Sequence, residues 1–319
     1  MLNISNSSER NKGILFAALT ALVWGFLALK LKLALQFIDP FSLVWVRFFF
    51  AFIMLVFWMR SLKKKATLRV KPLKWIIPCS LGLGLNYLGF LKGVELAGPV
   101  TAQVIIQVGP LLLSLAGVIL FKEKISPKQV LGLLFLIPGF YLFYDEKIQQ
   151  ASTFDIYNKG SLFVLLGAIS WAIYGIFQKK LVKNNGPENI NLFIFAFCSC
   201  LYLPITDFAK ILNLSFMPML LMILLGLNTL LAYSFVGEAL KRIEANLVGV
   251  IITLNPLITV ITVLTLETLG IGSFGPENLS IKALIGILSF ISGAIIFVYF
   301  GIPNKALPIN EQAHKKTKN

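Results

Sequence analysis

The chain has 319 residues, of which 57% are hydrophobic and 13% are charged, and its mean hydropathy is +0.82. These values exclude an ordinary soluble protein and place the chain in a lipid bilayer. The formal net charge of +15 does not indicate nucleic-acid binding, because the basic residues lie between apolar runs, where they set the topology of a membrane protein.

The chain starts with a polar stretch, residues 1–11, and an apolar run without a small-residue cleavage site follows it. We therefore expect no cleaved signal peptide, and the first helix should remain as an anchor. The cysteines, Cys79, Cys198 and Cys200, lie in or beside apolar segments. An odd number of cysteines without a nearby histidine fits neither a disulfide framework nor a zinc site.

Ten apolar segments reach the length of roughly 17 residues that a membrane-spanning helix needs. In chain order they cover residues 13–35, 40–60, 74–95, 99–121, 127–145, 160–181, 188–206, 215–237, 244–268 and 281–302. The predicted fold is an all-α integral membrane protein with ten transmembrane helices.

The fourth and ninth segments each carry a proline near the middle, Pro110 and Pro256. A proline cannot donate to the carbonyl four residues earlier, so we expect the carbonyls of Ile106 and Ile252 to be left free. In lipid such a group must find a partner or line a cavity. Broken helices in corresponding places of two halves indicate a transporter's binding site.

The chain repeats itself at about half its length. A shift of 147 residues lays Trp24 on Trp171, and a shift of 146 lays Pro110 on Pro256. Each half then has five helices, and because five is odd, the second half enters the membrane from the opposite side as an inverted repeat. We expect a first repeat at residues 13–145, a linker at 146–159, a second repeat at 160–302 and a polar cytoplasmic tail at 303–319.

The basic residues are divided unequally between the two sides of this predicted arrangement. Of the 29 lysines and arginines, 21 lie on the side of the N-terminus and seven on the other side, while Arg47 lies inside the second helix. The positive-inside rule then places both termini in the cytoplasm.

Three stretches make the chain similar to the EamA-type drug/metabolite transporters: KGILFAALTALVWGF, DPFSLVWVRFFFA with Arg47, and GPLLLSLAGVILFKEKIS, in which Glu123 follows Pro110. The resemblance covers nearly the whole chain. The second half is a weaker copy, with Leu192 in the place of Arg47 and an insertion, GIGSFGPEN, before the last helix. The resemblance implies a ten-helix permease that moves small metabolites, often outward, through a central cavity at the interface of its repeats.

Polar and amphipathic side chains gather near the predicted membrane midplane. Gln103 and Gln107 share one face of the fourth helix, and Asn246 and Thr253 share one face of the ninth. Polar groups in hydrocarbon are costly unless they face water or one another, so these stripes favour a solute pathway. The candidate substrate-binding residues are Trp24, Asn86, Tyr87, Gln103, Gln107, Trp171, Asn228, Tyr233, Thr253 and Asn255, with Pro110 and Pro256 as the helix breaks.

Each of these residues also has a purely structural interpretation. The tryptophans pack well against other side chains, and amides can join helices by hydrogen bonds worth roughly 0.6–2 kcal/mol. For Gly82, Gly89 and Gly93, on one face of the third helix, the structural interpretation is favoured: they let a neighbouring helix approach.

The first two predicted helices contain basic residues within their apolar runs. Arg47 is about two turns inside the second helix, where it can bind an anionic group or pair with Asp39 or with carbonyls at the helix end. The sequence leaves these alternatives open. Lys30 and Lys32 are expected to extend to the membrane interface.

No acidic residue lies in the central half of a predicted helix, so proton coupling has no obvious carrier. The one histidine, His314, lies in the polar tail, which argues against most metal and acid–base sites. We therefore expect no cofactor, no metal and no enzymatic activity.

Together these features predict a permease, exporter or exchanger of small polar metabolites such as amino acids, which works by alternating access through a central cavity between the repeats. A nucleoside, an S-adenosyl compound or a drug is the alternative substrate. A lipid-modifying membrane enzyme and a non-transporting receptor are the alternatives from other classes. The expected partners are a small-molecule substrate and the lipid bilayer of the bacterial inner membrane, without nucleic acid, and a homodimer stays open.

Overall fold

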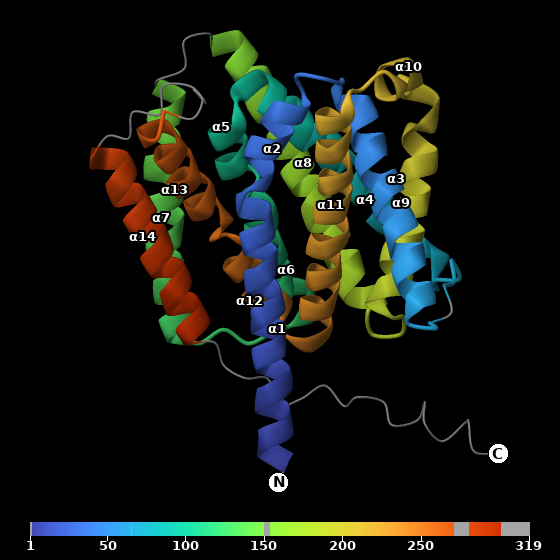
Figure 1. Cartoon of the computed structure of the whole chain (residues 1–319). Helices are drawn as coiled ribbons and strands as arrows, with labels where there is room; N and C mark the ends of the chain where they lie inside the picture. The colour runs from blue at the N-terminus through green and yellow to red at the C-terminus, as the bar shows by residue number, and fades with distance from the viewer. Residues whose placement is uncertain (1, 65, 150–153, 271–280, 301–319) are drawn as a thin grey trace, which may run out of the picture.

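The computed structural model describes residues 2–64, 66–149, 154–270 and 281–300, and all regular structure in these ranges is helical. The helices run side by side as a bundle (Figure 1). In chain order they are α1 (Leu2–Gly25), α2 (Leu27–Ala34), α3 (Pro40–Ser61), α4 (Leu73–Ala97), α5 (Pro99–Ile105), α6 (Val108–Phe121), α7 (Pro127–Gln149), α8 (Phe154–Leu181), α9 (Pro187–Tyr202), the 3₁₀-helix η1 (Leu203–Ile205), α10 (Phe208–Leu212), α11 (Phe216–Arg242), α12 (Ala245–Ile252), α13 (Asn255–Thr268) and α14 (Ile281–Tyr299).

Within the described residues, seven segments are long and apolar enough to cross a membrane. They are Ser8–Ala34, Pro40–Ser61, Pro99–Phe121, Asn158–Leu181, Pro187–Ile205, Phe216–Arg242 and Ala245–Leu266. The chain is therefore a multi-pass membrane protein. Two further apolar helices, Pro127–Leu142 and Leu288–Phe297, are shorter, and the arrangement of ten spanning helices in two repeats stays a prediction.

A well-formed cap begins α3. Asp39 accepts hydrogen bonds from the backbone N–H groups of Phe41 and Ser42 at 3.0 and 3.1 Å, and the Ser42 hydroxyl donates to its second oxygen at 2.7 Å. Pro40 occupies the first helical position, where its missing N–H costs nothing. The cap satisfies donors at the helix start and engages both oxygens of the Asp39 carboxylate.

Both segments with a central proline are interrupted. Ile106 and Gln107 separate α5 from α6, and Thr253 and Leu254 separate α12 from α13. In each pair the proline lies in the first turn of the second helix, where the absence of its N–H is tolerated. The breaks therefore divide each segment into two half-helices that meet near the middle of the bundle (Figure 1).

The expectation that the Ile106 carbonyl is left free is wrong. The backbone N–H of Gly109 donates to this carbonyl at 3.0 Å, and that of Leu111 donates to the Gln107 carbonyl at 3.1 Å. A tight turn between α5 and α6 therefore supplies the partner that Pro110 cannot. The break therefore does not leave this carbonyl as an unpaired acceptor.

The close packing of α4 on α8 depends on glycine. A side-chain carbon added at Gly89 would lie 2.5 Å from the carbonyl oxygen of Phe163, and one at Gly82 would lie 2.7 Å from that of Ser170. Such contacts leave no room for a methyl group, so the prediction that these glycines admit a neighbouring helix is confirmed.

Glycine also marks other contacts between the two halves of the chain. On the broken helices, a carbon added at Gly249 of α12 would lie 2.4 Å from the Pro110 carbonyl of α6. On α7 and α14, carbons added at Gly132 and Gly139 would lie 2.7 and 2.6 Å from the carbonyl oxygens of Gly293 and Gly286. Glycines thus bring α6 onto α12 and α7 onto α14 with backbone close to backbone.

Candidate functional site

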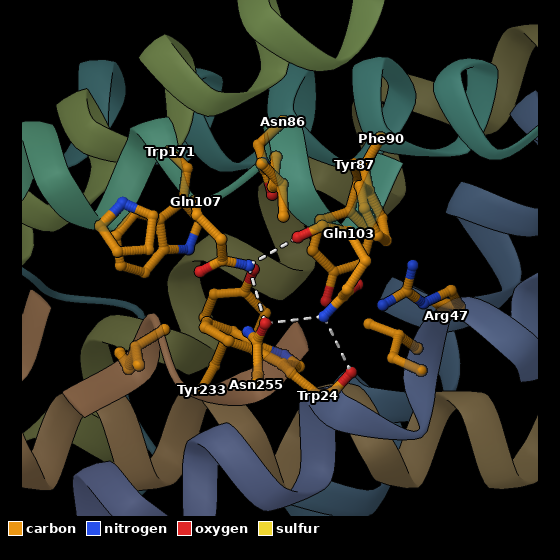
Figure 2. A pocket seen from close by; sticks show the side chains of 14 residues that line it. Trp24, Arg47, Asn86, Tyr87, Phe90, Gln103, Gln107, Trp171, Tyr233 and Asn255 are labelled. Carbon is orange, nitrogen blue, oxygen red and sulfur yellow. Dashed lines mark hydrogen bonds between the residues drawn. The ribbon is translucent and has the colours of Figure 1, made fainter. Parts of the chain in front are cut away.

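A cavity lies among helices from both halves of the chain, beside the first helix break (Figure 2). Its volume is about 50 Å³ as space for the centres of water-sized molecules, which corresponds to a few waters. The residues that line it are Trp24, Leu27, Arg47, Asn86, Tyr87, Phe90, Gln103, Ile106, Gln107, Pro110, Trp171, Tyr233, Ile252 and Asn255.

Three amide side chains form a hydrogen-bonded group at the centre of this cavity. The Nε2 atoms of Gln103 and Gln107 donate to Oδ1 of Asn255 at 2.8 and 2.7 Å. Asn255 begins α13, whereas the glutamines belong to the first half of the chain, so the group joins the two broken segments. Gln103 also donates to the Trp24 carbonyl at 3.4 Å, which ties the break to the end of α1.

The orientation of the Gln107 amide follows from its neighbours. Its Nε2 also donates to the backbone carbonyl of Gln103 at 2.8 Å, and a carbonyl can only accept. Nitrogen therefore faces Gln103 and Asn255, and Oε1 of Gln107 is a buried acceptor without a partner. A buried acceptor left unpaired is costly unless a ligand or water completes it.

Aromatic rings form the walls of the cavity. Trp24 meets Trp171 edge to face with ring centres 5.8 Å apart, and it meets Tyr233 in the same way at 5.4 Å. The rings of Tyr87 and Tyr233 lie 5.8 Å apart. Such contacts hold flat side chains in fixed positions, so the cavity has a preformed shape.

Arg47 reaches the cavity from α3, as Figure 2 shows. Only 2% of this residue is exposed, and its guanidinium lies 4.0 Å from the centre of the Tyr87 ring. Its Nε is buried without a hydrogen-bond partner. Asp39, one of the partners that the sequence suggests for Arg47, instead caps α3.

Most of the predicted site residues meet at this cavity. Those that line it are Trp24, Asn86, Tyr87, Gln103, Gln107, Trp171, Tyr233 and Asn255, together with the helix-break residue Pro110. Asn86 has a structural contact as well, because its amide donates to the Gly167 carbonyl of α8 at 3.0 Å. Whether these residues bind a solute is a proposal.

Three predicted residues lie outside the lining of this cavity. The Asn228 side chain accepts a hydrogen bond from Lys30 at 3.4 Å, and the Thr253 hydroxyl donates to the carbonyl of Val250, in the last turn of α12, at 2.6 Å. Pro256 lines a second hollow of about 30 Å³ between α13, α7 and α14. Gln107 borders both hollows.

Some residues at the cavity were not among the predicted site residues. Phe90 and Leu27 are apolar, and nothing in their sequence context separates them from residues that face lipid or core. Ile106 and Ile252 also line the cavity, and their places four residues before the two prolines are the signal that marks them. Arg47 is different, since an arginine inside an apolar helix is itself a signal of function.

Two buried charges lie away from the cavity, near the end of the bundle where α6 ends and α12 begins. The Glu123 carboxylate accepts from the backbone N–H groups of Ala245 and Asn246 at 2.8 and 2.9 Å. Lys179 of α8 donates to the carbonyls of Leu240 and Ile243 at the end of α11. Both groups complement the partial charges at helix ends. Lys179 is therefore buried in the bundle, although the sequence suggests only a topology-setting surface charge.

No group of three or more histidine, cysteine, aspartate or glutamate side chains that could hold a metal ion occurs among the residues that the structure describes. The cavity lining carries amides, aromatic rings and one guanidinium. This set of groups can bind a small polar molecule by hydrogen bonds, stacking and charge.

The chain matches the model of the EamA-like transporter family twice, at residues 11–144 and 158–300. A protein of Haemophilus influenzae named an uncharacterized transporter is 30% identical over 93% of this chain and 96% of its own length. The uncharacterized inner membrane transporter YhbE of Escherichia coli K12 is 31% identical over 89% of this chain and 90% of its own length.

The name of a more distant relative includes a class of substrate. It is a Salmonella typhimurium protein named a probable amino-acid metabolite efflux pump, 24% identical over 56% of each chain. A solved crystal structure has a similar fold, with a TM-score of 0.69 and 19% identity, and the match covers 92% of this chain and 99% of that one.

Proposed function

Because the chain belongs to the EamA-like transporter family, we propose that it carries small polar metabolites such as amino acids across the inner membrane by alternating access. The chain is a membrane transporter of this family, and the proposal concerns its substrate and its mechanism. The cavity lined by Trp24, Gln107 and Asn255 is the proposed substrate site. The alternatives of a lipid-modifying enzyme and a receptor receive no support from the names of the relatives.

The observation that carries this proposal is the position of the amide group. Gln103, Gln107 and Asn255 lie at the two helix breaks and face one another across the boundary between the halves. In transporters built of inverted repeats, substrate sites lie where discontinuous helices of the two repeats meet. Since Oε1 of Gln107 has no protein partner, the amide group has capacity for a solute.

The packing of helices supports the proposed arrangement of ten spans in two inverted repeats, at residues 13–145 and 160–302 with a linker at 146–159. α3 packs on α9 and α7 on α14, so each of these elements meets its counterpart in the other half, and α6 packs on α12 as its counterpart α13 packs on α5. α4 packs on α8 just as α11 packs on α1. In the proposed repeats α11 is the counterpart of α4 and α1 is the counterpart of α8, so the two-fold symmetry relates one contact to the other. Rocking of one repeat against the other would then expose the cavity to each side in turn.

Direction and coupling belong to the same proposal. The relative from Salmonella is named an efflux pump, which favours export or exchange. The 14 residues that line the cavity include no carboxylate and no histidine, so the site holds no ordinary proton carrier. An exchanger or facilitator driven by a solute gradient fits this lining best.

Thermal-shift screening of the purified protein tests the proposed function. The probes are the amino acids, a set of nucleosides and S-adenosylmethionine, because a ligand that binds the folded state raises its melting temperature. We expect at least one of these probes to stabilise the protein and to enter vesicles that contain it. The proposal fails if no probe raises the melting temperature and none is taken up above the rate of empty vesicles.

A further inference from the structure

Arg47 carries a full charge inside the proposed site, and the rest of the described chain leaves that charge uncompensated. The residue lies in the spanning helix α3, is 2% exposed and makes no ion pair among the described residues. Arginine keeps its proton under all physiological conditions. A fixed positive charge in an apolar membrane helix is costly unless an anion or a hydrogen-bond acceptor meets it.

The contact that the structure gives Arg47 holds it without neutralising it. Tyr87 places its ring 4.0 Å from the guanidinium carbon, and the Tyr87 hydroxyl donates to Thr229 at 3.1 Å. The ring is thus a fixed platform that offsets only part of the cost of burying the cation. Asp39 already caps α3 with both of its oxygens.

The opposite side of the cavity offers the complementary kind of group. Oε1 of Gln107 is an acceptor without a partner, and in Figure 2 Gln107 and Arg47 lie on either side of Gln103. A solute that bears an anion at one end and an N–H donor at the other would satisfy both. The aromatic rings of the same cavity lining, among them Trp24 and Tyr233, would cover its carbon atoms and attract a cationic donor.

We propose that Arg47 binds the carboxylate of the transported solute and that this solute is an α-amino acid, with its ammonium group directed to Gln107. This inference rests on the proposed function and narrows it to one substrate class. The site carries a positive charge on one side only, because the position that corresponds to Arg47 in the second half is Leu192, a buried apolar residue. The amino acid therefore binds in one orientation, with its carboxylate towards α3.

The first test changes the solute and leaves the protein intact. Purified wild-type protein is titrated with each amino acid and with the corresponding amino-acid amide, which keeps the ammonium and the side chain but has no carboxylate. We expect the best amino acid to bind roughly 10- to 100-fold more tightly than its amide, as a charged hydrogen-bonded pair requires. Equal affinity for an acid and its amide would overturn the proposal.

The second test changes the protein. In Arg47→Gln the affinity for that amino acid should fall roughly 10- to 100-fold, while the affinity for the amide stays as in wild type. Arg47→Lys should retain part of the affinity, because it keeps the charge and loses the two-pronged geometry. The matched control is Arg60→Gln, the same substitution at an exposed position of the same helix, which should bind as wild type does.

Melting temperatures of the empty proteins separate binding from structure. Removal of an unpaired buried charge should leave the melting temperature of Arg47→Gln unchanged or higher. A structural role of Arg47 instead predicts a lower melting temperature with unchanged affinity per folded molecule, and that result contradicts the proposal. If Arg47→Gln does not fold, the comparison of acid and amide on wild type still decides the matter.

The same measurements distinguish failure of this inference from failure of the proposed function. If a nucleoside or another solute without a carboxylate is bound and transported, and no amino acid is, the proposed transport of a polar metabolite stands and the role of Arg47 is refuted. If no probe is bound or transported, both proposals fail together.

Discussion

Gln107 distinguishes a substrate cavity from a set of structural hydrogen bonds between helices. Replacement of this residue by leucine removes a hydrogen-bonding group at similar bulk. If Gln107 binds the solute, Gln107→Leu should weaken binding and transport by roughly 1–3 kcal/mol with little loss of folded protein. Uptake into vesicles per folded molecule and the melting temperature are the two measurements.

Gln129 supplies a matched control for this substitution. It is a buried glutamine on α7 that accepts from the Ser126 N–H at 2.9 Å and donates to the Phe297 carbonyl at 3.3 Å, and it does not line the cavity. Gln129→Leu should lower the melting temperature and leave uptake per folded molecule unchanged. Identical behaviour of the two variants would mean that Gln107 is structural.

The site residues were partly accessible to sequence reasoning. Depth in the membrane and the period of 3.6 residues place Gln103 and Gln107 on one face of a helix, and the structure shows both at the cavity. The same reasoning does not predict which groups a given helix face will contact. The Thr253 hydroxyl donates to the nearby Val250 carbonyl at the helix break, and Asn228 bonds to Lys30, because local and long-range partners compete for each polar group.

At the scale of elements, Glu123 joins the first half of the chain to the start of α12. Its two oxygens accept from two backbone N–H groups there, and its negative charge complements the helix N-terminus. Glu123→Gln removes the charge and converts one acceptor into a donor. We expect a loss of stability of about 1–3 kcal/mol, measured as a lower melting temperature in detergent.

An exposed glutamate gives the control for this change. Glu95 forms a 2.8 Å ion pair with Lys92 at the end of α4, and such exposed pairs contribute little to stability. Glu95→Gln should melt within a degree or two of wild type, on the order of 0–1 kcal/mol. If Glu123→Gln melts at the same temperature, the carboxylate does not hold α12.

The element boundaries show which part of the fold the sequence encodes locally. Proline positions predict both helix breaks, because a proline removes a backbone donor whatever surrounds it. They do not predict that the turn before Pro110 rebuilds a hydrogen bond from Gly109 to Ile106, since that depends on how the chain relaxes. The glycines of α4 likewise indicate close packing, while the identity of the partner, α8, is a property of the folded bundle.

For the whole molecule, the charge distribution predicts the orientation in the membrane. With 21 basic residues on the side of the N-terminus and seven on the other side, we expect both termini and residues 60–74 to face the cytoplasm. The beginning of α1 and the end of α7 lie at opposite ends of the bundle (Figure 1). Reporter fusions should therefore place residues 145–159 outside, and a cytoplasmic signal from fusions there would reverse the orientation.

The energy source is a further property of the whole molecule. Since the cavity lining has no carboxylate or histidine, a gradient of the solute should suffice to drive transport. We expect counterflow in vesicles to persist after an uncoupler collapses the proton gradient. A strict requirement for that gradient would show that a titratable group outside the cavity takes part.

The contact between Trp24 and Trp171 gives the cavity an optical property. The chain has five tryptophans, and these two, from opposite halves, meet edge to face in the cavity wall. The fluorescence of an indole responds to the polarity around it, so a solute that displaces water from this wall changes the emitted colour and intensity. Binding and release of the solute can then be followed in real time by the tryptophan fluorescence of the unlabelled protein. The Trp171→Phe variant, which lacks one of the two indoles, serves as the control.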